Sequence, residues 1–205
     1  MNIALLGATG AVGGHFLTKA LAAGYAVKAL VRTPEKLRKD ASLSVLKGDV
    51  ANPVDVAELI RGADVVVSCL GNVKGMLIME KAAEVILQTA AEQSKPPKCL
   101  FISSIGCGGT SWTVKCMLQM IGGRSSFADY ERADARISRE EVVPYVLVRP
   151  AALKEKPGNG KHRYFQGDGT FARPIAKEDV AEFLLDAVSS NQWDGDGGLQ
   201  LAGMK

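Results

Sequence analysis

The amino-acid sequence predicts an α/β fold: a single doubly wound domain with a mainly parallel β-sheet. Short β-rich runs alternate with helical patterns along the chain, as right-handed crossovers between parallel strands require. Several of these runs are almost continuously apolar, which is typical of parallel strands covered on both faces. With 205 residues, the chain is long enough for one well-formed core, so we expect one domain over residues 1–205.

The elements follow one another as strand and helix. Runs such as "NIALLG", "DVVVSCLG" and "PYVLVRP" are rich in Val, Ile, Leu and Ala, and each is followed by a turn. Six strands are expected, at 2–7, 26–32, 43–49, 64–71, 98–104 and 144–150. Five helices are expected between and after them, at about 12–23, 53–61, 76–94, 128–141 and 177–189.

Two stretches break the alternation. Residues 105–127 are rich in glycine and serine at their ends and apolar in the centre, where Trp112, Met117, Met120 and Ile121 stand. Residues 154–172 are polar and turn-rich, and we interpret "GNGKHRYFQGDG" within them as a connection. Both follow strands at the edge where doubly wound folds bind ligands, so both are placed to shape a pocket. The alternative for the first stretch is a hydrophobic surface helix. Its apolar centre could be a substrate lid if the protein is a reductase, or a surface for a protein partner if the protein is non-catalytic.

Composition excludes several classes of function. The net charge of +3 is small, and no dense basic stripe with interleaved aromatic residues predicts nucleic-acid binding. The cysteines form no C-x-x-C pair and have no nearby histidine cluster, so we expect no metal site and reduced thiols. No apolar run is long enough for a membrane span, and the first residues show neither the basic n-region nor the cleavage site expected of a signal peptide. We expect a protein that is not secreted, in the cytoplasm or in an organelle matrix or stroma after removal of a transit peptide.

The first candidate site is the glycine-rich stretch "GATGAVGGHF" at 7–16, between the first strand and the first helix. Its spacing is Gly7-x-x-Gly10-x-x-Gly13. One glycine permits the tight turn, a second lets a pyrophosphate touch the backbone, and a third lets helix and strand pack closely. The helix N-terminus then offers unpaired N–H groups to the phosphates, and Thr9 can add a hydroxyl.

The residue at the end of the second strand bears on the choice of cofactor. Enzymes that select NAD usually place Asp or Glu there, to bind the ribose 2′-hydroxyl. This chain has Arg32 followed by Thr33, with Lys36 and Arg38 nearby. Because a guanidinium can pair bidentately with a 2′-phosphate, the sequence predicts NADP(H) rather than NAD(H).

An ordered series of motifs resembles the atypical, NmrA-like short-chain dehydrogenase/reductase family, in the small form that includes biliverdin reductase B and flavin reductase. The matching segments run almost end to end: "GATGAVG", "LVRTPEKL", "GDV", "VVSCLG", "FISSIG", "YVLVRPAAL", "IAKEDVAEFLLDAV" and "GLQLAG". The resemblance implies a Rossmann domain that binds NAD(P), and a reductase activity.

The resemblance also implies roles for residues at the ends of later strands. It places Asp49 and Val50 against the adenine, Leu70 and Gly71 along the adenosine ribose, Ser103 and Ser104 at the nicotinamide end, and Pro150 and Ala151 beside the ring. The complete expected cofactor-binding set is Gly7, Ala8, Thr9, Gly10, Ala11, Val12, Gly13, Arg32, Thr33, Asp49, Val50, Leu70, Gly71, Ser103, Pro150 and Ala151. Purely structural roles compete with these: Asp49 could cap a turn, Pro150 could end a strand, and Ser104 could satisfy nearby backbone.

The catalytic signature of the family is missing. Short-chain dehydrogenases use a tyrosine and a lysine four residues later, whose ammonium lowers the phenol pKa from about 10 toward neutrality. Here Tyr130 is followed at that spacing by Asp134, a carboxylate expected to raise the phenol pKa, and the lysine position of the family falls near Glu131.

Two functional interpretations therefore stay open. In the first, the protein is an NADPH-dependent reductase that transfers a hydride to a small conjugated or carbonyl substrate, with Ser104, Tyr130 or water supplying the proton. In the second, it is a non-catalytic NADP(H)-binding regulator or a structural subunit of a larger assembly.

Overall fold

The structure is a computed structural model, and it describes residues 1–72, 76–108, 115–116, 119–120, 123–165 and 173–204. Its strands are β1 (Asn2–Leu6), β2 (Ala26–Val31), β3 (Leu43–Lys47), β4 (Val65–Ser68), β5 (Lys98–Ile102), β6 (Tyr145–Pro150), β7 (Leu153–Lys154), β8 (His162–Phe165), β9 (Ile175–Ala176) and β10 (Leu199–Gly203). Its longer helices are α1 (Ala11–Ala22), α2 (Pro53–Ile60), α3 (Met79–Ala91), α5 (Arg124–Ile137) and α6 (Lys177–Ser189).

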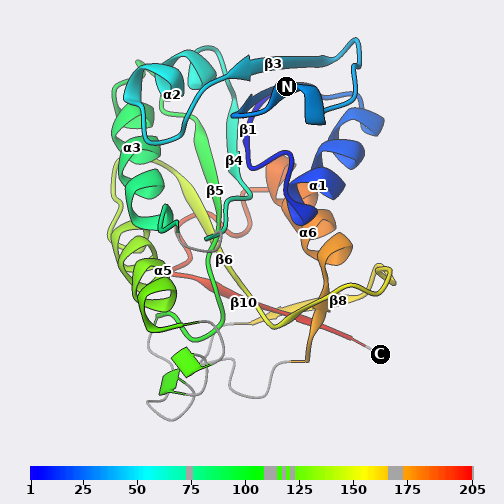
Figure 1. Ribbon diagram of the computed structural model, residues 1–205, viewed down its shortest axis with the longest axis vertical. Coiled ribbons are helices and arrows are strands. Elements are labelled where there is room, and N and C mark those ends of the chain that lie inside the picture. Colours follow the sequence, from blue (N-terminus) through cyan, green and yellow to red (C-terminus); the bar gives the residue numbers. More distant parts are fainter. Residues whose placement is uncertain (73–75, 109–114, 117–118, 121–122, 166–172, 205) are drawn as a thin grey trace.

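The main sheet confirms the predicted doubly wound α/β architecture (Figure 1). Its strand order is β3-β2-β1-β4-β5-β6-β10-β8, and every neighbouring pair is parallel except β10 and β8. The chain leaves β1 toward β2 and β3, and then returns to the other side of β1 with β4. This reversal is the topological switch point at which open α/β sheets bind ligands.

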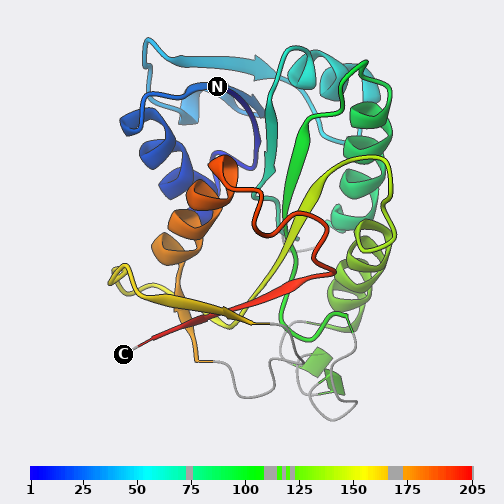
Figure 2. The ribbon, with the colours of Figure 1, turned by 180° about the vertical axis from the view of Figure 1, so that it is seen from behind.

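The helices cover both faces of the sheet. Helices α1 and α6 pack together on one face, and α2, α3 and α5 cover the other (Figures 1 and 2). Alternate residues of β1 divide between the two cores: Ile3 and Leu5 face α1 and α6, whereas Ala4 and Leu6 face α2 and α3. Because both faces of the central strands β1, β4 and β5 are buried, these strands are mainly apolar, which is the pattern that made them recognisable in the sequence.

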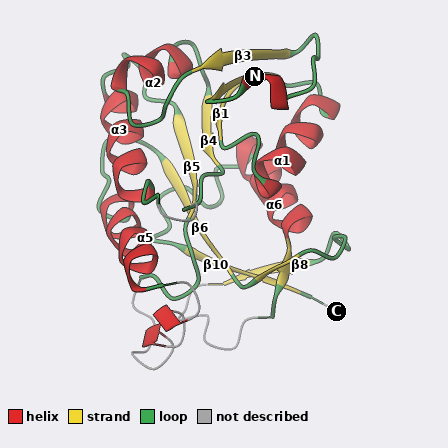
Figure 3. Ribbon diagram, viewed as in Figure 1, coloured by secondary structure: helices red, strands yellow, loops and turns green. Residues whose placement is uncertain are grey.

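All six predicted strands and all five predicted helices are present, with ends shifted by a few residues (Figure 3). The interpretation of 158–169 as a connection is wrong at His162–Phe165, which form β8 and pair antiparallel with β10. Tyr164 packs against Phe183 and Trp193 on the α6 side, and these aromatic contacts fix a strand whose sequence is mostly polar.

Much of the stretch at 105–127 lies outside the described residues, including Trp112, Met117 and Ile121, as does the end of the 154–172 stretch. Met120 is described and is 81% exposed. Within the described part of the chain, no helix is both long enough and apolar enough to cross a bilayer.

Candidate functional site

The turn between β1 and α1 is packed so closely that side chains are excluded from it. Gly7 has a φ of 77°, and a Cβ atom there would collide with the carbonyl of Cys69 at the end of β4. A Cβ atom at Gly13, in the first turn of α1, would collide with the carbonyl oxygen of Gly7. The third glycine therefore has the close-packing role that its spacing predicts.

The N-terminus of α1 is open to a ligand. Gly10 is its N-cap, no described side chain caps it, and the first turn contains no acidic residue. The first N–H groups of a helix have no intrahelical acceptor and carry a partial positive charge. Thr9 and Gly10 are both exposed. Backbone donors without side-chain cover are what a pyrophosphate needs.

A pocket with a cavity volume of about 180 Å³ lies beside this turn. It is formed at the carboxyl ends of β1, β2, β3 and β4, where parallel strands end at the same edge of the sheet. The lining residues are Leu6, Gly7, Thr9, Gly10, Leu30, Val31, Arg32, Gly48, Asp49, Val50, Cys69, Leu70, Gly71, Met76 and Ile78.

Half of the cofactor-binding residues expected from the sequence are brought together there: Gly7, Thr9, Gly10, Arg32, Asp49, Val50, Leu70 and Gly71. The other expected residues do not line this pocket: Ala8, Ala11, Val12, Gly13, Thr33, Ser103, Pro150 and Ala151. Among them, Ala8 and Val12 are buried behind the glycine turn, and Ala151 is buried beyond β6.

Arg32 lines the pocket, and no carboxylate among the described residues pairs with its guanidinium. Its side chain is exposed, and its Nη1 donates a hydrogen bond to the Sδ of Met76 at 3.3 Å. Within the described part of the chain, Arg32 forms no ion pair. A guanidinium with only a thioether as partner is available to an anionic ligand.

Asp49 has a structural role as well as a place in the pocket. Its Oδ1 accepts a hydrogen bond from the backbone N–H of Ala51 at 2.9 Å, so it does cap a turn. Its own backbone N–H donates to Asp55 Oδ2 at 2.9 Å. This pairing anchors the end of β3 to α2 and leaves Asp49 exposed at the pocket wall.

The segment between β4 and α3 is held against α5. The Asn72 side chain accepts from the N–H of Ile78 at 3.0 Å and donates to the carbonyl and the hydroxyl of Ser126, each at 3.1 Å. The backbone N–H of Asn72 donates to the Tyr130 hydroxyl at 3.3 Å. Asp129 accepts from the first N–H groups of α3, at Met79 and Glu80. Helix α5 therefore fixes the wall of the pocket that contains Ile78.

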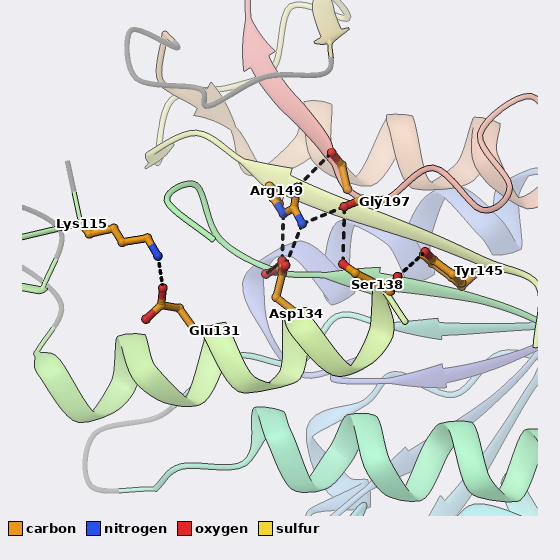
Figure 4. Close-up of polar contacts among 9 residues, drawn as sticks. Lys115, Glu131, Asp134, Ser138, Tyr145, Arg149 and Gly197 are labelled. Carbon is orange, nitrogen blue, oxygen red and sulfur yellow. Dashed lines mark hydrogen bonds and ion pairs between the residues drawn. The ribbon is translucent and has the colours of Figure 1, made fainter. Parts of the chain in front are cut away.

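The other half of the carboxyl edge holds a buried polar cluster (Figure 4). Asp134 of α5 accepts from Ser103 Oγ at 2.6 Å and from the Nε and Nη2 of Arg149 at 2.9 and 2.7 Å. Arg149 also donates to the carbonyls of Gly197 and Gly198. All three side chains are buried. This cluster joins β5, α5, β6 and the segment before β10.

The two candidate proton donors differ in their surroundings. Ser104 is partly exposed, and its hydroxyl donates to the carbonyl of Ile105 at 3.1 Å, so the expected alternative of local backbone satisfaction is present. Burial raises the pKa of Tyr130, and Asp129 adds to this effect. The direction agrees with the sequence analysis but the cause does not, because the carboxylate of Asp134 is engaged by Arg149.

Glu131, near which the resemblance places the family's lysine, pairs with Lys115 at 2.7 Å (Figure 4). Burial also raises the pKa of the Cys69 and Cys107 thiols, each to about 12. The four cysteines are free, and the described residues contain no group of three or more His, Cys, Asp or Glu side chains that could hold a metal ion.

Sequence reasoning missed the contributions of Asn72, Met76 and Ile78, and the pairing of Asp134 with Arg149. The sequence does contain a signal for the role of Arg149, because a charged residue inside a strand that is apolar on both faces needs a buried partner. No signal in the sequence indicates the role of Asn72, since its partners in α5 lie 54 and 58 residues away.

The strand order, the glycine turn and the pocket at the switch point define a doubly wound dinucleotide-binding domain. Residues 7–191 match the family described as NAD(P)H-binding, and the chain belongs to that family. The resemblance seen in the sequence is thereby confirmed at the level of an NAD(P)-binding, oxidoreductase-like fold.

Relatives include reductases. The chain is 27% identical over 205 residues to an uncharacterized chloroplastic protein of Arabidopsis thaliana, covering 91% of this chain and 71% of that protein. It is 26% identical over 215 residues to the chloroplastic divinyl chlorophyllide a 8-vinyl-reductase of the same plant, covering 92% of this chain but only 50% of the reductase. The solved structure of ChuY, an anaerobillin reductase from Escherichia coli, matches with a TM-score of 0.82 and 21% identity, over 100% of this chain and 99% of that one. At that identity, the structural likeness shows the fold.

Proposed function

We propose that this protein binds NADP(H) and reduces a small conjugated or carbonyl-bearing molecule. Membership of the NAD(P)H-binding family supports a nicotinamide cofactor, and the reductases among its relatives support the direction of the reaction. The preference for NADP(H) rests on one observation: Arg32 stands at the end of the pocket without an acidic partner among the described residues.

The glycine turn suits the pyrophosphate of this cofactor. Gly7 and Gly13 leave no room for side chains, and the uncapped first turn of α1 presents N–H donors beside the pocket. Val50 and Leu70 offer apolar walls for the adenosine, and Arg32 offers bidentate donors for its 2′-phosphate. Ser103, Pro150 and Ala151 are proposed for the nicotinamide end, through backbone and apolar contacts, because the Ser103 hydroxyl is engaged by Asp134.

When bound, NADPH supplies a hydride. The protein must then hold the substrate and provide a proton. With its pKa raised by burial, Tyr130 keeps its proton at neutral pH, so it can donate but cannot act as a base. Ser104 is the other candidate donor, and water is the third. This arrangement favours reduction over oxidation.

A non-catalytic role as an NADP(H)-binding regulator or assembly subunit is the second candidate. It is favoured by Glu131, an acidic residue where the family's catalytic lysine would stand. The chloroplastic relatives make an organelle a reasonable compartment for either role.

The cofactor proposal can be tested by titrating the purified protein with NADPH and NADH and following nucleotide fluorescence. We expect tighter binding of NADPH. Arg32→Glu should weaken NADPH binding by about tenfold or more, because it removes a charge-assisted pair and adds repulsion. Arg38→Glu is the matched control: it makes the same charge change at an exposed residue outside the pocket lining. An unchanged ratio in Arg32→Glu would refute the specificity argument.

Turnover is tested separately, with panels of flavins, quinones and carbonyl compounds, by following absorbance of the reduced nicotinamide. Consumption of NADPH supports the reductase. Tight NADPH binding without consumption across the panels would favour the regulator or assembly subunit.

A further inference from the structure

The partner of Arg32 is unusual for a cation at a binding site. Its Nη1 donates to the Met76 thioether, which is a neutral and weak acceptor. Met76 is 42% exposed and lines the pocket beside Arg32. No described carboxylate pairs with the guanidinium. Met76 therefore holds the Arg32 guanidinium only weakly.

Described residues on either side of Met76 in the sequence are held by α5. Asn72 and Ile78, on either side of Met76 in the sequence, are joined by a hydrogen bond from the Ile78 N–H to the Asn72 side chain. Asn72 is in turn bonded to Ser126 and Tyr130 of α5. Both flanking residues are thus tied to the body of the protein, and Ile78 lines the same pocket.

We propose that Met76 is a second specificity-determining residue for NADP(H), an inference that rests on the proposed function. Its apolar side chain closes the adenosine end of the pocket and keeps Arg32 at the pocket edge without neutralising it. A thioether gives up the guanidinium to a phosphate at little cost, because a 2′-phosphate is a far stronger acceptor. A carboxylate in the same place would hold the guanidinium and repel the phosphate.

The test introduces that carboxylate. Met76→Glu places an acid beside Arg32, and Met76→Leu keeps a neutral apolar side chain of similar size. Leu77→Glu is the matched control, because Leu77 is the next residue, is 48% exposed and does not line the pocket. Dissociation constants for NADPH and NADH are measured by calorimetry for each variant, with circular dichroism to verify folding.

We expect Met76→Glu to weaken NADPH binding by at least about fivefold, through competition for Arg32 and repulsion of the 2′-phosphate. NADH binding should change by less than about twofold, since NADH carries no 2′-phosphate and more distant charges are screened. Met76→Leu and Leu77→Glu should each keep the NADPH/NADH ratio within about twofold of the wild type.

The inference is overturned if Met76→Glu leaves the ratio unchanged, or if Leu77→Glu alters it equally. It is also overturned if Met76→Leu loses the preference, because the neutral side chain would then be insufficient. Failure of the proposed function gives a different result: the wild type binds neither nucleotide, or Arg32→Glu has no effect on the ratio.

Discussion

The two halves of the sheet's carboxyl edge use their polar groups in opposite ways. At the end formed by β1 to β4, Thr9, Arg32 and Asp49 are exposed around an open pocket. At the end formed by β5 and β6, Asp134 and Arg149 are buried and bonded to each other. The first half has donors and charge available to a ligand from solvent, whereas the second half uses its charges to join elements of the fold.

This difference places the groups available for cofactor binding at one end of the edge and the candidate proton donors at the other. The proposed cofactor specificity depends on Arg32, whose charge has no acidic partner among the described residues. At the proposed reacting end, Asp134 and Arg149 are bonded to each other. Proton transfer there would depend on neutral groups such as Ser104 and Tyr130. A reaction that needs only positioning and a proton from a neutral donor is compatible with this arrangement.

The largest change in stability is expected when the buried carboxylate at the β5 and β6 end is removed. Asp134→Ala leaves the Arg149 guanidinium buried without its carboxylate, which should lower the free energy of unfolding by about 3–5 kcal/mol. The same change in the first half, Asp49→Ala, removes an exposed turn cap and should cost only about 1 kcal/mol. Urea unfolding followed by circular dichroism measures both.

Similar losses of stability in the two variants would contradict the difference between the two halves. The double variant Asp134→Leu with Arg149→Met tests the cause of the larger loss. Replacing both charges by apolar groups should restore most of the loss, because an unpaired buried charge is the main penalty.

Smaller changes in the free energy of unfolding, opposite in sign, are expected at two adjacent glycines near the start of α1. Gly13→Ala should lower the free energy of unfolding by about 2–3 kcal/mol, because the new methyl group collides with the carbonyl of Gly7. Gly14→Ala should raise it by about 0.5–1 kcal/mol, since its Cβ would lie 3.8 Å from the nearest atom, the Ala8 carbonyl oxygen, and alanine favours the helix. Equal destabilisation by both substitutions would show that the close packing is not specific to Gly13.

The first half of the site could be predicted from the sequence because local backbone constraints define it. A glycine that must lie against another carbonyl, and an arginine at a strand end, are specified by residues close in the chain. Apolar strands covered on both faces were recognisable for the same reason, and six of the seven parallel strands of the sheet were predicted, all except β10. What Thr33, Ala11 and the other expected cofactor contacts do toward a nucleotide stays a prediction.

The second half could not be predicted, because its geometry depends on residues distant in the sequence. Ser103 is a plausible cofactor contact in the linear motif "FISSIG", but its hydroxyl is taken by Asp134, 31 residues later. The strand β8 was missed because it is short and its partners are distant in the sequence: it pairs with β10, and Tyr164 contacts Phe183 and Trp193.

The smallest effect concerns Tyr130, which lies where the two halves meet. Burial raises its pKa above the ordinary tyrosine value, so the folded protein holds the phenolic proton more tightly than the unfolded chain does. The stability associated with the neutral phenol is therefore complete below about pH 10 and falls as the pH rises through the raised pKa.

Tyr130→Phe isolates this contribution, because it keeps the ring and removes the group that titrates. Near neutral pH the variant should be less stable than the wild type by about 1 kcal/mol, since the N–H of Asn72 loses its acceptor. The difference should shrink as the pH rises from about 8 to about 10.5, because only the wild type has a phenol that ionises on unfolding. The buried Cys69 and Cys107 thiols also destabilise the fold at alkaline pH, but they do so equally in both proteins. A difference that stayed constant over this range would mean that the Tyr130 hydroxyl reaches solvent, and the phenol would then belong with the accessible groups of the first half.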